Sequence, residues 1–369
     1  MTETGELASR YEQRLGRAAE LVSAQLPNPA DPFGFETWAA LSDHARSVAS
    51  YLWPYDTDRA GNLANRAGRS AYHRGDYANA TTIFGTLTTD RVEVLGDKHP
   101  DTLTARANLA SSYWSAGRTA DAMTLEEQVL VDRVEVLGDK HPDTLTARAN
   151  LANSYRSAGR TTEAITLLEQ VLVDHFEVLG DKHPDTLIAR ANLATSYWSA
   201  GRTADAITLL KQVLVDRVEV LGDKHPSTLI ARANLATSYW SAGRTADAIP
   251  LQEQVLDDST EVLGDKHPDT LMAIANLATS YWSAGRATDA ITLQEQVLVD
   301  RVDVLGDKHP DTLASLHNLA VSLFEAGDQT RALQLEQDAV TGLIETLGPE
   351  HPNTHQVAGV LEQMEIEAS

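Results

Sequence analysis

Apolar residues recur at steps of three and four along most of the chain, which is the period of an α-helix. One such stripe, within residues 100–117, consists of Leu103, Ala107, Ala110 and Tyr113. The next stripe follows Thr119 and consists of Ala122, Leu125, Val129, Leu130, Val134 and Val136. A glycine stands after each stripe, where helices commonly end in left-handed geometry. The pattern therefore predicts two helices joined by a short turn.

This helix pair repeats every 42 residues, and the hexapeptide Leu-Gly-Asp-Lys-His-Pro marks each repeat. Copies begin at Leu95, Leu137, Leu179, Leu221, Leu263 and Leu305, and a weaker copy begins at Leu347. A fixed period of this length predicts stacked units that share one continuous core. Pro100 is expected to open a helix, with Asp101 or Thr102 capping its first turn. The glycine and proline turns interrupt any heptad seam, which excludes a long coiled coil.

The ends of the chain depart from the repeat. We expect an N-terminal helical segment, a diverged first repeat, six full units and a C-terminal capping helix at residues 1–56, 57–94, 95–346 and 347–369. The first predicted helix carries Leu7, Tyr11, Leu15, Ala19, Val22 and Leu26, and a second is expected near Glu36–Leu52. The capping helix would keep Glu362, Glu365 and Glu367 on a wet outer face.

The run Leu109-Ala110-x-x-Tyr113-x-x-x-Gly117, followed by Ala122, resembles the tetratricopeptide repeat. The 42-residue period and the Gly-x-x-His-Pro-Asp-Thr turn resemble the variety found in kinesin light chains. The resemblance implies an all-α fold, a right-handed α-α solenoid of tandem helix pairs. It also implies a concave groove lined by the first helix of each pair. Repeats of this variety tolerate proline where Pro250 stands, so we expect a helix there as well.

A second resemblance concerns residues 1–56, where Ala18-Ala19-Glu20-Leu21-Val22 precedes Trp38-x-x-Leu41-x-x-His44. This segment looks like the region that joins an NB-ARC-type NTPase to its repeats in bacterial signalling proteins. The sequence contains no Gly-x-x-x-x-Gly-Lys-[Ser/Thr] loop, so we expect no NTPase module in it.

Composition narrows the classes of partner. The formal net charge of −23 argues against DNA or RNA as the main partner. The absence of cysteine excludes disulfides and thiolate chemistry. No apolar run approaches the 18 residues of a membrane span, and the N-terminus has no secretory pattern, so a cytoplasmic protein is the simplest reading.

The sequence offers no catalytic signature, and its histidines do not form a metal site. Neither Gly-x-Ser-x-Gly nor His-Glu-x-x-His occurs, so we expect no enzyme activity and no cofactor. One histidine recurs per repeat, and helices about 10 Å apart would place these rings in a row rather than around one ion. We expect each ring to fix its turn by a hydrogen bond, and no metal to bind.

Two polar and aromatic rows on the first helices are candidate ligand contacts. The first row consists of Asn108, Asn150, Asn192, Asn234, Asn276 and Asn318. An amide donates to and accepts from a peptide backbone, so this row suits an extended ligand, and bridging between adjacent helices is the alternative role. The second row consists of Trp114, Trp198, Trp240 and Trp282, which serve either as binding contacts or as packing between neighbouring helices.

One groove-facing position changes from polar to apolar along the array. It is occupied by Thr104, Thr146, Ile188, Ile230, Met272 and Ala314, so the later repeats should prefer apolar ligand side chains. Arg106, Arg148, Arg190 and Arg232 stand where the family has an apolar residue. We expect their guanidinium groups to reach an acid on a second helix, and pairing with a charged group of the ligand is the alternative role.

These features predict a non-catalytic scaffold or sensor that binds a protein or an extended peptide in the groove. The alternative is a regulatory or self-association segment, which contacts an NTPase module or copies of itself.

Overall fold

The computed structural model describes residues 3–369, with side chains from residue 10 onward, so the predicted packing of Leu7 lies outside the described residues. This part of the chain forms seventeen α-helices and one 3-10 helix and contains no strand. In chain order they are α1 (Glu3–Gln25), η1 (Pro32–Gly34), α2 (Phe35–Leu52), α3 (Thr57–His73), α4 (Tyr77–Leu95), α5 (Pro100–Ser115), α6 (Thr119–Leu137), α7 (Pro142–Ser157), α8 (Thr161–Leu179), α9 (Pro184–Ser199), α10 (Thr203–Leu221), α11 (Pro226–Ser241), α12 (Thr245–Leu263), α13 (Pro268–Ser283), α14 (Ala287–Leu305), α15 (Pro310–Glu325), α16 (Gln329–Leu347) and α17 (Pro352–Ala368).

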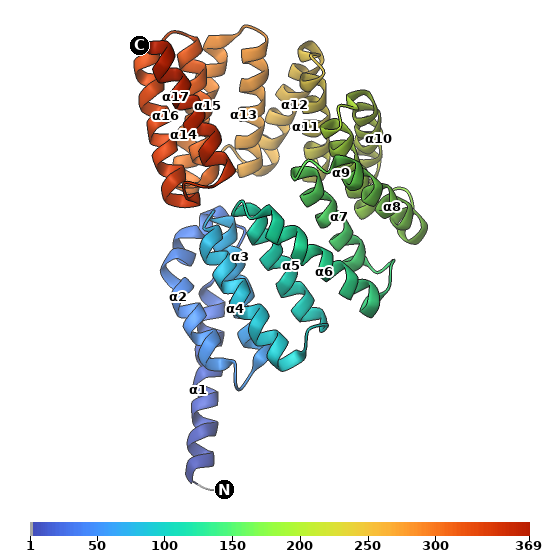
Figure 1. Cartoon of the computed structure of the whole chain (residues 1–369), viewed down its shortest axis with the longest axis vertical. Helices are drawn as coiled ribbons and strands as arrows, with labels where there is room; N and C mark the ends of the chain where they lie inside the picture. The colour runs from blue at the N-terminus through green and yellow to red at the C-terminus, as the bar shows by residue number, and fades with distance from the viewer. Residues whose placement is uncertain (1–2) are drawn as a thin grey trace. The chain divides into compact units, whose positions relative to one another are not determined.

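The chain divides into two compact units, and the boundary between Asp132 and Arg133 falls inside α6. Within each unit, consecutive helices pack against one another, for example α3 with α4 and α11 with α12 (Figure 1). The all-α fold and the repeated helix pair are therefore confirmed, while the hand of a superhelix stays a prediction.

Each hexapeptide forms the same turn between two helices. Gly96 follows α4 with a φ of 90°, and Pro100 is the first residue of α5. The cap is the imidazole of His99, whose Nδ1 accepts the backbone N–H of Asp101 at 3.2 Å. The expectation that Asp101 or Thr102 caps this turn is wrong, because the extended backbone at His99 places its ring over the first turn. The predicted role of the histidine is confirmed.

The lysine of the hexapeptide adds a charge pair to this corner. In the C-terminal unit it pairs with an acid 37 residues further on, in the second helix of the following pair. The pairs are Lys140 with Glu177, Lys182 with Glu219 at 2.5 Å, Lys224 with Glu261 at 2.5 Å, Lys266 with Asp303 at 2.6 Å and Lys308 with Glu345 at 2.8 Å. These side chains are about half exposed, so each pair contributes no more than about 1 kcal/mol.

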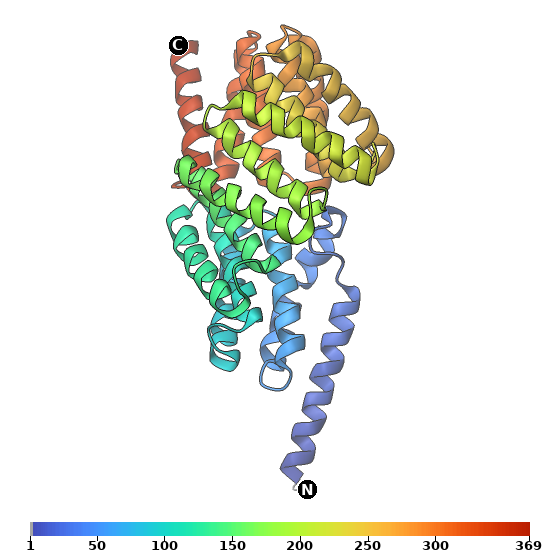
Figure 2. The ribbon, with the colours of Figure 1, turned by 90° about the vertical axis from the view of Figure 1, so that its right-hand side faces the viewer.

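In the N-terminal unit, aromatic side chains replace part of the repeated aliphatic core. Trp38 is fully buried, and its indole N–H donates to the carbonyl of Pro27 at 3.2 Å. Gly68 lies against the ring of Phe84, where an added Cβ would come within 2.7 Å of ring carbons. The diverged first repeat has glycine here because Phe84 fills the space that a side chain would need. The N-terminal part of α1 extends beyond α2 of the same unit (Figure 2).

The C-terminal unit ends as the cap prediction requires. Val357 and Leu361 of α17 pack into a cluster with Leu313 and Leu343, while the outer face of this helix carries exposed glutamates. Helix α12 continues through Pro250, which confirms the helix predicted there.

Candidate peptide-binding site

The asparagine row is half-buried along the first helices except at Asn318, which is exposed, and its members differ in their contacts. In the N-terminal unit, the side-chain amide of Asn108 donates to Asn65 Oδ1 at 2.9 Å, which is the bridging role. In the C-terminal unit, no side-chain hydrogen bond is formed by Asn150, Asn192, Asn234, Asn276 or Asn318. These five amides can therefore pair with a ligand backbone without losing an internal partner.

Two of the four tryptophans in the second row donate a hydrogen bond from the indole N–H, and two do not. Trp240 Nε1 donates to Ser283 Oγ at 2.8 Å, and Trp282 Nε1 donates to Glu325 Oε2 at 2.9 Å, in each case one repeat further on. Trp114 and Trp198 are 42% and 41% exposed and form no such bond. The geometry thus gives Trp240 and Trp282 a packing role between repeats, and the ligand role of all four stays a prediction.

Four predicted residues meet at one cavity in the C-terminal unit. This cavity of about 250 Å³ lies among α11, α12 and α13. Ile230, Asn234, Met272 and Asn276 line it on the first helices. Its remaining lining is largely apolar and includes Leu229, Val255 and Leu263. Ile188 and Asn192 lie one repeat earlier and do not line this cavity.

The cavity exists because one repeat lacks a large side chain. Ser259 lines the cavity and is 2% exposed, and the equivalent positions hold Arg91, Arg133, His175, Arg217, Arg301 and Leu343. The four arginines donate to the backbone carbonyl ten residues further on, at 2.7, 2.7, 2.5 and 2.8 Å. The ring of His175 lies 3.1 Å from the matching carbonyl of Asp185. The cavity at Ser259 was not predicted from the sequence. The sequence feature that could have indicated it is the small serine at a position where the other repeats carry a larger side chain.

The four arginines on the first helices also form ion pairs within the protein. Arg106, Arg148, Arg190 and Arg232 pair with Asp132, Asp174, Asp216 and Asp258 at 2.7, 2.9, 2.7 and 3.1 Å. The predicted contact with an acid of a second helix is therefore confirmed. Three of these arginines also pair with the aspartate of the hexapeptide, which the sequence reasoning did not foresee.

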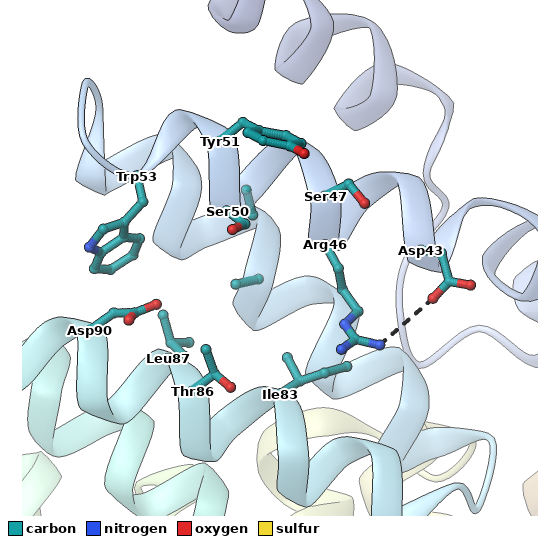
Figure 3. Close-up of a pocket in the computed structure, with 12 residues that line it drawn as sticks. Asp43, Arg46, Ser47, Ser50, Tyr51, Trp53, Ile83, Thr86, Leu87 and Asp90 are labelled. Carbon is teal, nitrogen blue, oxygen red and sulfur yellow. Dashed lines mark ion pairs between the residues drawn. The ribbon is translucent and has the colours of Figure 1, made fainter.

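A further cavity, of about 530 Å³, lies in the N-terminal unit between α2 and α4, over α3 (Figure 3). Trp53 and Asp90 lie at one end, and Arg46 and Asp43 lie at the other. Burial raises the pKa of the Asp90 carboxyl, and the nearby charge of Glu93 adds to the increase. This cavity was not predicted from the sequence.

Other ligand classes find no support in the part of the chain that is described. Within residues 10–369, no three histidine or carboxylate side chains are placed to hold a metal ion. None of the described helices is both long and apolar enough to cross a membrane.

The repeats define the family. Models of the tetratricopeptide repeat match residues 102–143, 144–185 and 186–227, and again residues 235–300 and 271–345, which together are more than half of the sequence. The chain belongs to the tetratricopeptide repeat family. These models match none of residues 1–101, so the expected kinship of residues 1–56 with NTPase-linked segments stays a prediction. No curated protein matches the chain.

Solved structures with similar repeats include a putative kinesin light chain with nearly identical repeats from Podosopora anserina. It is 33% identical, with a TM-score of 0.46, and the match covers 56% of this chain and 97% of that chain. BtubC from P. vanneervenii is 19% identical, with a TM-score of 0.52, over 63% of this chain and 94% of that chain. A Rap protein complexed with Competence and Sporulation Factor is 11% identical, with a TM-score of 0.56, over 94% of this chain and 99% of that chain.

Proposed function

We propose that the first-helix face of the C-terminal unit binds an extended segment of a partner protein, without catalysis. The observation that carries this proposal is the cavity lined by Ile230, Asn234, Met272 and Asn276, since it joins apolar lining to amides without internal partners. The structure of a Rap protein with a bound factor supports the proposal only in showing that a related fold accommodates a ligand.

The size of the cavity favours a single anchoring side chain. Pockets for whole small molecules usually measure about 300–1,000 Å³, whereas this cavity measures about 250 Å³. Its apolar lining suits a large aliphatic or aromatic side chain, whose burial contributes about 1.5–3 kcal/mol. An extended backbone advances about 3.3 Å per residue, so one repeat would meet about three ligand residues.

The absence of cysteine permits a direct test of this site. A single fluorophore is attached at Met272→Cys, beside the cavity, and a displayed library of random peptides is screened for capture by the protein. Peptides that bind should change the fluorescence at this position. The matched control carries the fluorophore at Val215→Cys, an exposed position on α10, and should not respond. Equal responses at both positions, or no captured peptide, would contradict the proposed site.

Self-association, a regulatory role and a cytoplasmic location stay predictions. A mass measurement in solution tests the first of these, because a monomer at the working concentration would exclude assembly of copies as the main role.

A further inference from the structure

The register of the repeats identifies an arginine that the first repeat lacks. In four later repeats, a first-helix arginine forms an ion pair with an aspartate 26 residues further on, and Arg190 with Asp216 is one example at 2.7 Å. One repeat before Arg106, the same first-helix position holds Ala64, and the matching aspartate is Asp90. The acid is thus present in the first repeat, and its partner is absent.

Asp90 has no replacement partner within the described residues. Its carboxylate forms neither a hydrogen bond nor an ion pair, although the side chain is partly buried. Each equivalent acid from Asp132 to Asp300 is paired with an arginine or a lysine. A partly buried carboxylate is ordinarily stabilised by an opposite charge. Asp90 is therefore an exception among the aspartates that occupy this position in the repeats.

The missing arginine leaves the cavity between α2 and α4 (Figure 3). Ala64 lines this cavity together with Asp90, and Ala49, Ile83 and Leu87 form apolar lining. Arg46 lies at the far end, where it pairs with Asp43 at 3.7 Å and donates to Asn79 at 3.4 Å. Space, an apolar wall and an unpaired carboxylate therefore occur together.

Two further groups suit a guanidinium in this space. Trp53 lies at the same end as Asp90, and an indole face attracts a cation within about 6 Å. Arg106 also donates to Gln128 Oε1 at 3.1 Å, and the first repeat has Thr86 at the position of Gln128. The Thr86 hydroxyl lines the cavity and still has acceptor capacity for a second guanidinium N–H.

We propose that this cavity binds an alkylguanidinium group, which takes the place of the absent first-helix arginine and pairs with Asp90. The group is either the side chain of an arginine in a partner polypeptide or a free alkylguanidinium compound. The site lies in the N-terminal unit and is separate from the proposed peptide-binding face, so it is an additional binding function.

The test uses n-butylguanidinium as the probe and the full chain as the protein. Binding is followed by titration calorimetry and by the indole signal of Trp53 in NMR spectra. Asp90→Asn should weaken binding about tenfold or more, since it removes a charge-assisted hydrogen bond. Ala64→Arg should abolish binding, because it restores the side chain that later repeats carry. Glu36→Gln is the matched control, at an exposed position of α2 that does not line the cavity, and it should leave binding nearly unchanged.

The outcomes separate the proposal from its alternatives. No binding by the unaltered protein, or equal binding by Asp90→Asn, would overturn it. Equal binding of n-butylammonium would also overturn it, because the site would then recognise charge rather than the guanidinium. Asp90→Asn is close in shape to the original residue, so it keeps the test decisive if Ala64→Arg folds poorly.

The source of the group is found with capped peptides. Binding of acetyl-Gly-Arg-Gly-amide, but not of acetyl-Gly-Leu-Gly-amide, would support an arginine of a polypeptide. Binding of n-butylguanidinium alone would support a free compound. Neither result depends on peptide capture near Met272, so failure of the proposed function would be seen separately.

Discussion

Ser259→Arg should fill the cavity of the C-terminal unit and stabilise it. The substitution restores the residue present as Arg217 and Arg301 in other repeats, where each donates to a backbone carbonyl. In the altered protein, the corresponding acceptor is the carbonyl of Asp269, which lies at the cavity. The same change should block the proposed ligand, because the new side chain would occupy its anchoring space.

The expected increase in the free energy of unfolding of the Ser259→Arg protein is the sum of a few opposing contributions. Burying the arginine methylenes contributes about 2 kcal/mol, and a hydrogen bond from a charged donor contributes about 1.5–3 kcal/mol. Ordering the side chain costs about 2 kcal/mol, and removing the guanidinium from water costs part of the remainder. A net stabilisation of about 1–2 kcal/mol remains, which corresponds to a midpoint increase of about 2–8 °C for a unit of this size.

Thermal unfolding by circular dichroism measures this gain, and peptide titration measures the block. Peptides selected at Met272→Cys should lose about tenfold or more in affinity for the Ser259→Arg protein, because their anchoring side chain cannot be buried. Arg217→Ser is the mirror control, and it should lower the midpoint by opening a matching space between α9 and α11. A Ser259→Arg protein with an unchanged midpoint and unchanged peptide affinity would refute this account of the cavity.

Three other changes test the repeats themselves. Replacing Asn192, Asn234 and Asn276 with alanine should weaken peptide capture with the melting curve unchanged, whereas a collapsed melting curve would assign the row to structure. Deleting one whole 42-residue unit should leave a folded, shorter protein by circular dichroism, because each repeat contacts only its neighbours, and complete unfolding would count against a repeat array. Arg190→Ala should reduce the free energy of unfolding by about 3–5 kcal/mol in denaturant titrations, because it leaves the buried Asp216 carboxylate without an ion-pair partner. Arg244→Ala removes an exposed pair and should cost less than about 1 kcal/mol, and equal losses would contradict this ranking.

The sequence predicted what the repeats share, since identical residues at a fixed period adopt identical geometry. The helix pairs, the turn-fixing histidines and the pairing of Arg106 with an acid on the next helix are of this kind. The cap was less predictable, because Asp101 and His99 both supply an acceptor and only the backbone geometry at His99 decides between them. The direction of the Trp240 indole was also undecided, since packing and ligand contact need the same exposed ring.

The cavities were missed for a different physical reason. Each arises from one small residue, Ser259 or Ala64, in a column of larger side chains. Whether such a gap stays open depends on how far neighbouring helices close around it, and helical periodicity carries no information about that distance.

The contact between Arg217 and the Ser227 carbonyl has a consequence for how units can be combined. Most repeats have aspartate where Ser227 stands, yet the arginine donates to the backbone there as it does elsewhere. Because every residue supplies a carbonyl, the receiving side of this junction is insensitive to side-chain identity. A unit whose first helix begins at the His-Pro turn can therefore follow any unit that keeps the arginine donor on its second helix. Whole units can then be exchanged without changing the residues at the turn between them.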